Sequence, residues 1–89
     1  LKTDIKIYSS NITAANNNDL DAAGSVTISR VNGKNGSKLI AGNESDINAG
    51  SYIWVNKSEV TSNNANRLTA NGRNAGDVVE LQGATVTSN

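Results

Sequence analysis

Apolar residues in this chain form short clusters with a period of two, and they do not recur at the three- and four-residue spacing of a helix. In residues 1–9, Leu1, Thr3, Ile5 and Ile7 alternate with polar residues, as in a half-buried strand. Stretches rich in Asn, Gly and Ser, which favour tight turns, separate the clusters. The pattern predicts an all-β fold with essentially no helix.

Composition predicts a single β domain over residues 1–89 with a thin core. Only 36% of the residues are hydrophobic, and the chain has no Phe and no Met. It also lacks Cys and His, so neither disulfides nor an ordinary zinc site can supplement the core. We therefore expect further stabilisation from neighbouring copies of the chain.

Charge and residue content argue against several classes of function. The formal net charge is zero and the eight Lys and Arg residues are scattered along the sequence, whereas nucleic-acid binding needs a basic face. No segment approaches the length of a membrane span. Without His, a Ser or Thr nucleophile lacks its usual base. We expect a non-enzyme without cofactor, nucleic-acid partner, membrane contact or small-molecule ligand.

Two carboxylate pairs, Asp19/Asp21 and Glu44/Asp46, are the candidate metal ligands. Their oxygens could hold Ca²⁺, but the spacing lacks the Gly and terminal Glu of an EF-hand loop. Both pairs lie in Asn-rich stretches, so we expect solvated turn residues and no metal site.

An Asn-Gly step occurs twice between two β-like clusters, at Asn32-Gly33 and Asn35-Gly36. Asn-Gly favours two-residue hairpin turns because both residues accept positive φ. The segment 25–41 is therefore predicted to be an antiparallel hairpin.

Residues 51–56 carry the only Trp and are apolar on both faces. Ile53 and Val55 share one face, and Tyr52 and Trp54 share the other, as in a strand at the centre of a sheet or at an interface. Tyr52 and Trp54, with Val60 on the next short strand, are the candidate interface residues. An alternative role for the aromatic pair is a carbohydrate site in a β-sandwich.

Internal repeats favour a different topology. Asn48-Ala-Gly and Asn74-Ala-Gly are each followed at the same offset by Val-Thr-Ser-Asn, ending at Asn63 and Asn89. Weaker copies of the second block begin at Ser10 and Ser37. This resembles the repeats of filamentous-haemagglutinin-like secreted adhesins, which implies a parallel β-solenoid fragment, extracellular or on the cell surface, with Asn ladders at its corners. In that fold Val60 lies beside Val86.

The order of clusters resembles the small β-sandwich virion proteins of tailed bacteriophages. An apolar strand at 5–8, a hairpin over 26–40, the segment 47–55, a strand at 67–70 and a closing segment 75–81 carry the resemblance. It implies a missing first strand ahead of Leu1 and a jelly-roll-like antiparallel sandwich. The implied function is that of a structural virion subunit, either a capsid-decoration or a tail-accessory protein. Such a subunit binds other virion proteins and copies of itself. We prefer this sandwich to the solenoid because of the predicted hairpin.

Overall fold

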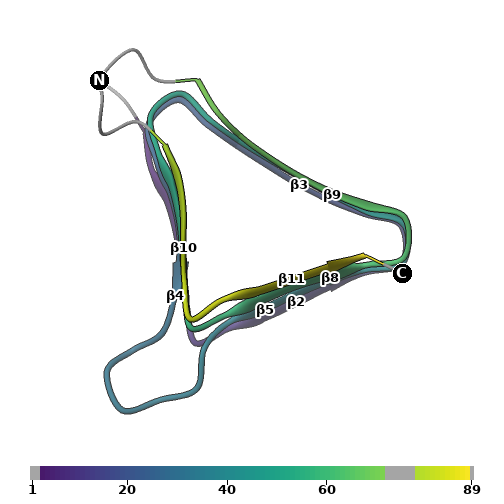
Figure 1. Ribbon diagram of the computed structural model, residues 1–89, viewed down its shortest axis with the longest axis horizontal. Helices are drawn as coiled ribbons and strands as arrows, with labels where there is room; N and C mark the ends of the chain where they lie inside the picture. The colour runs from purple at the N-terminus through teal and green to yellow at the C-terminus, as the bar shows by residue number, and fades with distance from the viewer. Residues whose placement is uncertain (1–2, 72–77, 89) are drawn as a thin grey trace.

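The computed structural model describes residues 3–71 and 78–88, and these residues form a three-sided parallel β-solenoid (Figure 1). The described strands are, in chain order, β1 (Ile5–Tyr8), β2 (Asn11–Ala14), β3 (Asn17–Ala22), β4 (Val26–Ser29), β5 (Lys38–Ala41), β6 (Glu44–Ala49), β7 (Ile53–Asn56), β8 (Glu59–Ser62), β9 (Ala65–Ala70), β10 (Val79–Gln82) and β11 (Thr85–Ser88). Helices are absent from this described part of the chain. It therefore contains no helix that could cross a membrane.

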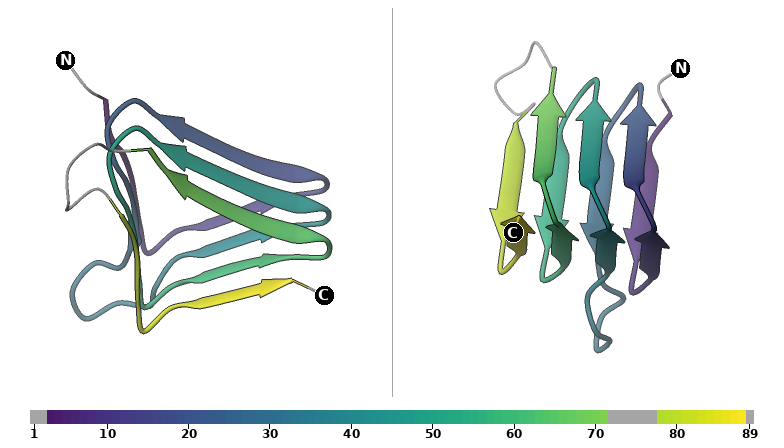
Figure 2. Two further views of the ribbon diagram at one scale, coloured as in Figure 1. Left: turned by 45° about the horizontal axis from the view of Figure 1, so that its top comes forward. Right: turned by 90° about the vertical axis from the view of Figure 1, so that its right-hand side faces the viewer.

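Every third strand returns to the same side of the solenoid. The first side is the sheet β1-β4-β7-β10, the second is β2-β5-β8-β11, and the third is β3-β6-β9. All pairs within the three sheets are parallel. Three consecutive strands thus make one rung, and the rungs stack along the axis seen from the side in Figure 2.

The basic rung is 21 residues long. Ile5 pairs with Val26, 21 positions further on, and Lys38 pairs with Glu59 at the same offset. Across the loop between β4 and β5 the offset rises to 27, as in the pairing of Asn11 with Lys38. The second rung therefore carries a six-residue insertion.

The prediction of an antiparallel β-sandwich is wrong, although the all-β class is confirmed. The hairpin predicted over 25–41 would pair β4 with β5, but these strands belong to different sheets and each has only parallel neighbours. The Asn-Gly steps lie in the loop that leads around a corner of the solenoid. The same turn residues serve a corner and a hairpin, because both need a sharp change of local backbone direction.

The solenoid alternative accounts for the observed pairing. Val60 pairs with Val86 in adjacent rungs, so the two Val-Thr-Ser segments of the repeat lie side by side. The Asn-Ala-Gly copy at 74–76 lies outside the described residues. Between the second and third sides, the amide of Asn64 donates to Asn43, and that of Asn43 donates to Asn17 Oδ1 at 3.2 Å. The Asn ladder implied by the repeats is therefore present at this corner.

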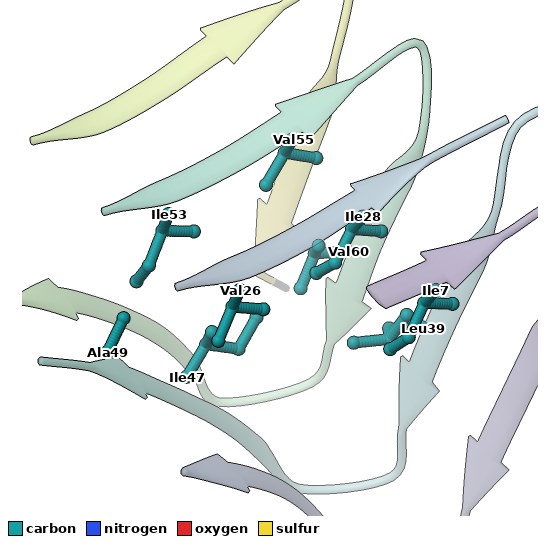
Figure 3. Packing of buried hydrophobic residues seen from close by; sticks show 9 residues of the cluster. All are labelled: Ile7, Val26, Ile28, Leu39, Ile47, Ala49, Ile53, Val55 and Val60. Carbon is teal, nitrogen blue, oxygen red and sulfur yellow. The ribbon is translucent and has the colours of Figure 1, made fainter. Parts of the chain in front are cut away.

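The core is a column of aliphatic side chains inside the triangle (Figure 3). Ile28, Leu39, Ile47 and Val55 are among the residues with no exposed surface. Each side of the triangle supplies two or three inward positions per rung, since residues alternate along a strand. Ala41 and Ala49 are buried at the ends of β5 and β6.

Candidate functional site

The corner between the first and second sides carries the main departure from regular stacking. In three rungs the turn there has two residues: Ser9-Ser10, Lys57-Ser58 and Gly83-Ala84. The first residue of each turn has positive φ, at 46° for Ser9, 49° for Lys57 and 59° for Gly83. A non-glycine residue in this left-handed region is strained by about 1 kcal/mol. The backbone geometry of this corner is thus the same in these three rungs.

In the second rung the same corner extends into a loop, residues 30–36, which we call the arm. Figure 1 shows it projecting at the lower left, away from the triangular body. Within it, Lys34 N donates to Val31 O at 2.9 Å, and Gly33 has a φ of 83°. These features close a compact turn at the tip.

The base of the arm is fixed to the rungs on both sides. Ser9 Oγ donates to Asn35 O at 2.6 Å and accepts from Val31 N at 2.8 Å. On the other side, Gly36 lies so close to Lys57 that an added Cβ would be 1.6 Å from the Lys57 carbonyl oxygen. Only glycine fits at this position, and the contact holds the arm in a defined orientation.

Beneath the arm, a ladder of serines satisfies backbone groups inside the corner. Ser37 and Ser58 are 1% and 3% exposed. Ser10 N donates to Ser37 Oγ at 3.2 Å, and Ser37 N donates to Ser58 Oγ at 3.0 Å. The hydroxyls in turn donate to carbonyls, Ser37 Oγ to Ser29 O at 2.8 Å and Ser58 Oγ to Asn56 O at 2.9 Å. This ladder of hydrogen bonds makes the backbone inside the corner rigid.

A groove runs along each flank of the arm. The N-side groove, of about 580 Å³, lies against the first rung, and the C-side groove, of about 400 Å³, lies against the third and fourth rungs. Three residues border both grooves, namely Asn35, Gly36 and Lys38. The remaining lining of the N-side groove is Tyr8, Ser9, Asn11, Val31 and Lys34. The remaining lining of the C-side groove is Ser37, Lys57, Ser58, Glu59, Gly83 and Thr85.

Basic side chains gather at the arm and grooves. Arg30 and Lys34 belong to the arm, and Lys38 and Lys57 border the grooves. The acidic residue among the lining is Glu59, whose carboxylate is 3.6 Å from Lys38 Nζ, with both side chains about half exposed. Solvent screens such a pair strongly, so the surface keeps a local positive charge although the chain as a whole is neutral.

The third side presents the opposite charge. Asp19 and Asp46 pair in register on the outer face of β3 and β6, with Arg67 next to them on β9. Arg67 Nη1 lies 2.9 Å from Glu44 and 3.4 Å from Asp46. Hydrogen bonds to these two carboxylates raise the pKa of the Arg67 guanidinium above its ordinary value.

The carboxylates of the third side were expected in turns, and that placement is wrong. Asp19 and Asp21 lie on β3, and Glu44 and Asp46 lie on β6. Asn48 Nδ2 also donates to Asp21 Oδ1 at 3.0 Å. Within the described ranges, no three acidic side chains come together in a way that could hold a metal ion.

The predicted interface residues fall in two environments. Trp54 is on the outer face of β7, between Thr27 and Glu80 by register, and its indole N–H is buried without a hydrogen-bond partner. Tyr52 is 39% exposed just before this strand. Val60 has no exposed surface, because it packs in the core beside its neighbours on β5 and β11. A partner could therefore reach Tyr52 and Trp54 but not the Val60 side chain.

Sequence reasoning missed the arm and its basic grooves. Lys34, Lys38 and Lys57 are scattered in the chain, and they come together only when the rungs stack. The 27-residue spacing between the copies that begin at Ser10 and Ser37 spans the arm, and it is the feature that could have located the insertion. No protein family model matches the chain, and the curated proteins and solved structures contain no match to it.

Proposed function

We propose that the chain is a segment of a secreted β-solenoid adhesin whose arm and flanking grooves contact the partner. The observation that supports this most is the in-register stacking of parallel rungs, together with the arm inserted at a corner. Stacked rungs form extended binding surfaces, and insertions within repeats map to loops that commonly face the ligand.

The arm suits this role because it is exposed yet anchored. Its residues Val31 and Lys34 are open to solvent, while Ser9 and Gly36 fix its two ends. A loop that is already ordered loses less conformational entropy when it binds. Binding residues also lie disproportionately on loops that a rigid scaffold positions.

Membership of a phage virion, with other virion proteins as partners, stays a prediction. It depended on a resemblance in strand order and on an antiparallel hairpin. Since β4 and β5 do not pair, the reason for preferring it to an adhesin is gone.

Adhesion can be tested with the chain coupled to fluorescent beads. The key variant lacks residues 30–35, which leaves Gly36-Ser37 as a two-residue turn like Gly83-Ala84. Beads with the unmodified chain should be retained on a panel of cell surfaces under flow, and beads with the shortened chain should not. Circular dichroism confirms that both are folded.

Arg67→Gln is the matched control, because it also removes positive charge but lies on the third side. Its beads should be retained like those with the unmodified chain. Retention no better than that of uncoated beads on every surface tested would reject the adhesin proposal. Equal retention of the shortened chain would reject the arm as the contact.

A further inference from the structure

We infer that the two grooves and the arm form one binding surface for a linear acidic polysaccharide, which runs along the solenoid axis past the base of the arm. This inference rests on the proposed adhesin function and names the class of ligand for its surface. It is carried by the adjacency of the grooves, their charge and their polar lining.

The grooves are adjacent along the axis, on the two flanks of the arm. Asn35, Gly36 and Lys38 border both of them, while Tyr8 lies at the first rung and Thr85 at the fourth. Successive rungs are separated by about 4.8 Å, the usual distance between paired strands. The lining thus spans about 14 Å in the axial direction, which is longer than one sugar ring and suits an extended polymer.

Positive charge is distributed along this path rather than gathered at one point. Lys34 lies in the N-side groove, Lys38 lies where the grooves meet, and Lys57 lies in the C-side groove. Arg30 adds a fourth cation at the root of the arm. A polymer with a carboxylate or sulfate on successive sugars would place one anion near each lysine.

The rest of the lining suits sugar hydroxyls. Asn11 and Thr85 are exposed side chains that both donate and accept hydrogen bonds. Glu59 can accept from a hydroxyl beside its partner Lys38. Tyr8 is 43% exposed in the N-side groove and offers an aromatic ring against which a sugar face can pack.

An acidic polysaccharide fits better than a nucleic acid, which is also a linear polyanion. Single-stranded nucleic acid is commonly held by several aromatic side chains on which successive bases stack, whereas Tyr8 is the aromatic residue among the groove linings.

Isothermal titration calorimetry on the full chain tests the inference. The probes are polygalacturonate for carboxylate, dextran sulfate for sulfate, unmodified dextran as the neutral polymer, and a thymidine oligonucleotide. We expect binding to at least one acidic polysaccharide, weakened by added salt, and no binding to unmodified dextran. Whichever of the two acidic polymers binds more tightly identifies the anionic group.

Three single variants localise the binding. Lys34→Gln and Lys57→Gln should each lower the affinity about fivefold, as expected for one partly exposed charge contact. Arg67→Gln on the third side should leave it unchanged. All three substitutions are on exposed side chains, so the variants should fold, as thermal melts would confirm.

The inference is overturned if neither acidic polymer binds, if the oligonucleotide binds more tightly than both, or if Arg67→Gln weakens binding as much as Lys57→Gln. Bead adhesion without polysaccharide binding would reject the ligand class while the adhesin proposal stands. Polysaccharide binding without bead adhesion would reject the adhesin proposal and leave the site in place.

Discussion

Replacing Ser58 by alanine should destabilise the solenoid much more than the same replacement at Ser45. Ser58 is 3% exposed, and its hydroxyl accepts from Ser37 N at 3.0 Å and donates to Asn56 O at 2.9 Å. Alanine removes both bonds and leaves the buried Ser37 N–H without a partner. One lost hydrogen bond costs about 1 kcal/mol and one orphaned buried donor about 1–3 kcal/mol, so the free energy of unfolding should fall by about 2–4 kcal/mol.

Ser45 provides the matched control. Its hydroxyl is also fully buried, on the inner side of β6, but it has no hydrogen-bond partner. Removing an unpartnered hydroxyl relieves its desolvation cost, so Ser45→Ala should leave stability unchanged or raise it by about 1 kcal/mol.

Urea titration followed by circular dichroism measures both variants. The Ser58→Ala midpoint should fall at an unchanged m-value, and its thermal midpoint should drop by about 8 °C or more for a domain of this size. The reasoning is refuted if Ser58→Ala and Ser45→Ala change stability by the same amount. That result would mean that burial alone, and not the ladder of bonds, determines the cost at this corner.

Three further outcomes follow from the corners and turns. Gly42→Ala should destabilise the fold by about 1–3 kcal/mol or more in urea titration. The reason is that the added Cβ would lie 2.0 Å from the backbone oxygen of Ala15 in the preceding rung. An unfolding curve like that of the unmodified chain would contradict this contact. The pKa of Asp4 is held below its ordinary 3.8 by the hydrogen bond from Ser25 N–H, so its stabilising effect is present above pH 3.8 and is lost as the pH falls through the lowered folded-state value. Asp4→Ala should therefore lower the melting temperature at pH 7, and this difference from the unmodified chain should shrink as the pH falls below 3.8. A difference of the same size above and below pH 3.8 would contradict the assignment. Deletion of residues 30–35 should change the melting temperature by only a few degrees, since loop length affects closure entropy weakly. Loss of the folded circular dichroism spectrum would show that the arm is needed for the stacking of the rungs.

The alternation of residues identified β1 and β7 correctly from sequence, but the Asn-rich stretches with the carboxylate pairs, which were expected to be turns, are strands β3 and β6. Ile53 and Val55 point into the core, while Trp54 lies on the other face, as their spacing predicts. The same holds for Ile7 on β1. Such alternation depends only on the local geometry of an extended chain, so it survives any choice of partner strand.

The direction of pairing could not be read from the local pattern around the arm. Asn32-Gly33 has the composition of a hairpin turn, and in a local window an insertion at a solenoid corner looks the same. Only the long-range offsets distinguish the two. The copies beginning at Ser10 and Ser37 are 27 residues apart, and removing the six inserted residues restores the 21-residue rung.

The site illustrates the same limit. Lys38 and Lys57 belong to successive rungs, and Tyr8 belongs to an earlier one. Their proximity depends on the register of three stacked rungs, so zero net charge and scattered basic residues concealed a local basic surface. Charge summed over a sequence carries no information about where on the folded surface the charges lie.

The insertion of the arm leaves the stack undisturbed. Leu39, on the strand that follows it, still pairs with Ile12 in the preceding rung and with Val60 in the following one. Changes of length at this corner therefore do not propagate into the sheets. Homologous chains could vary the length and chemistry of the arm freely while keeping the same architecture. A foreign peptide could likewise be grafted between Ser29 and Ser37, for display at a fixed distance from the solenoid body.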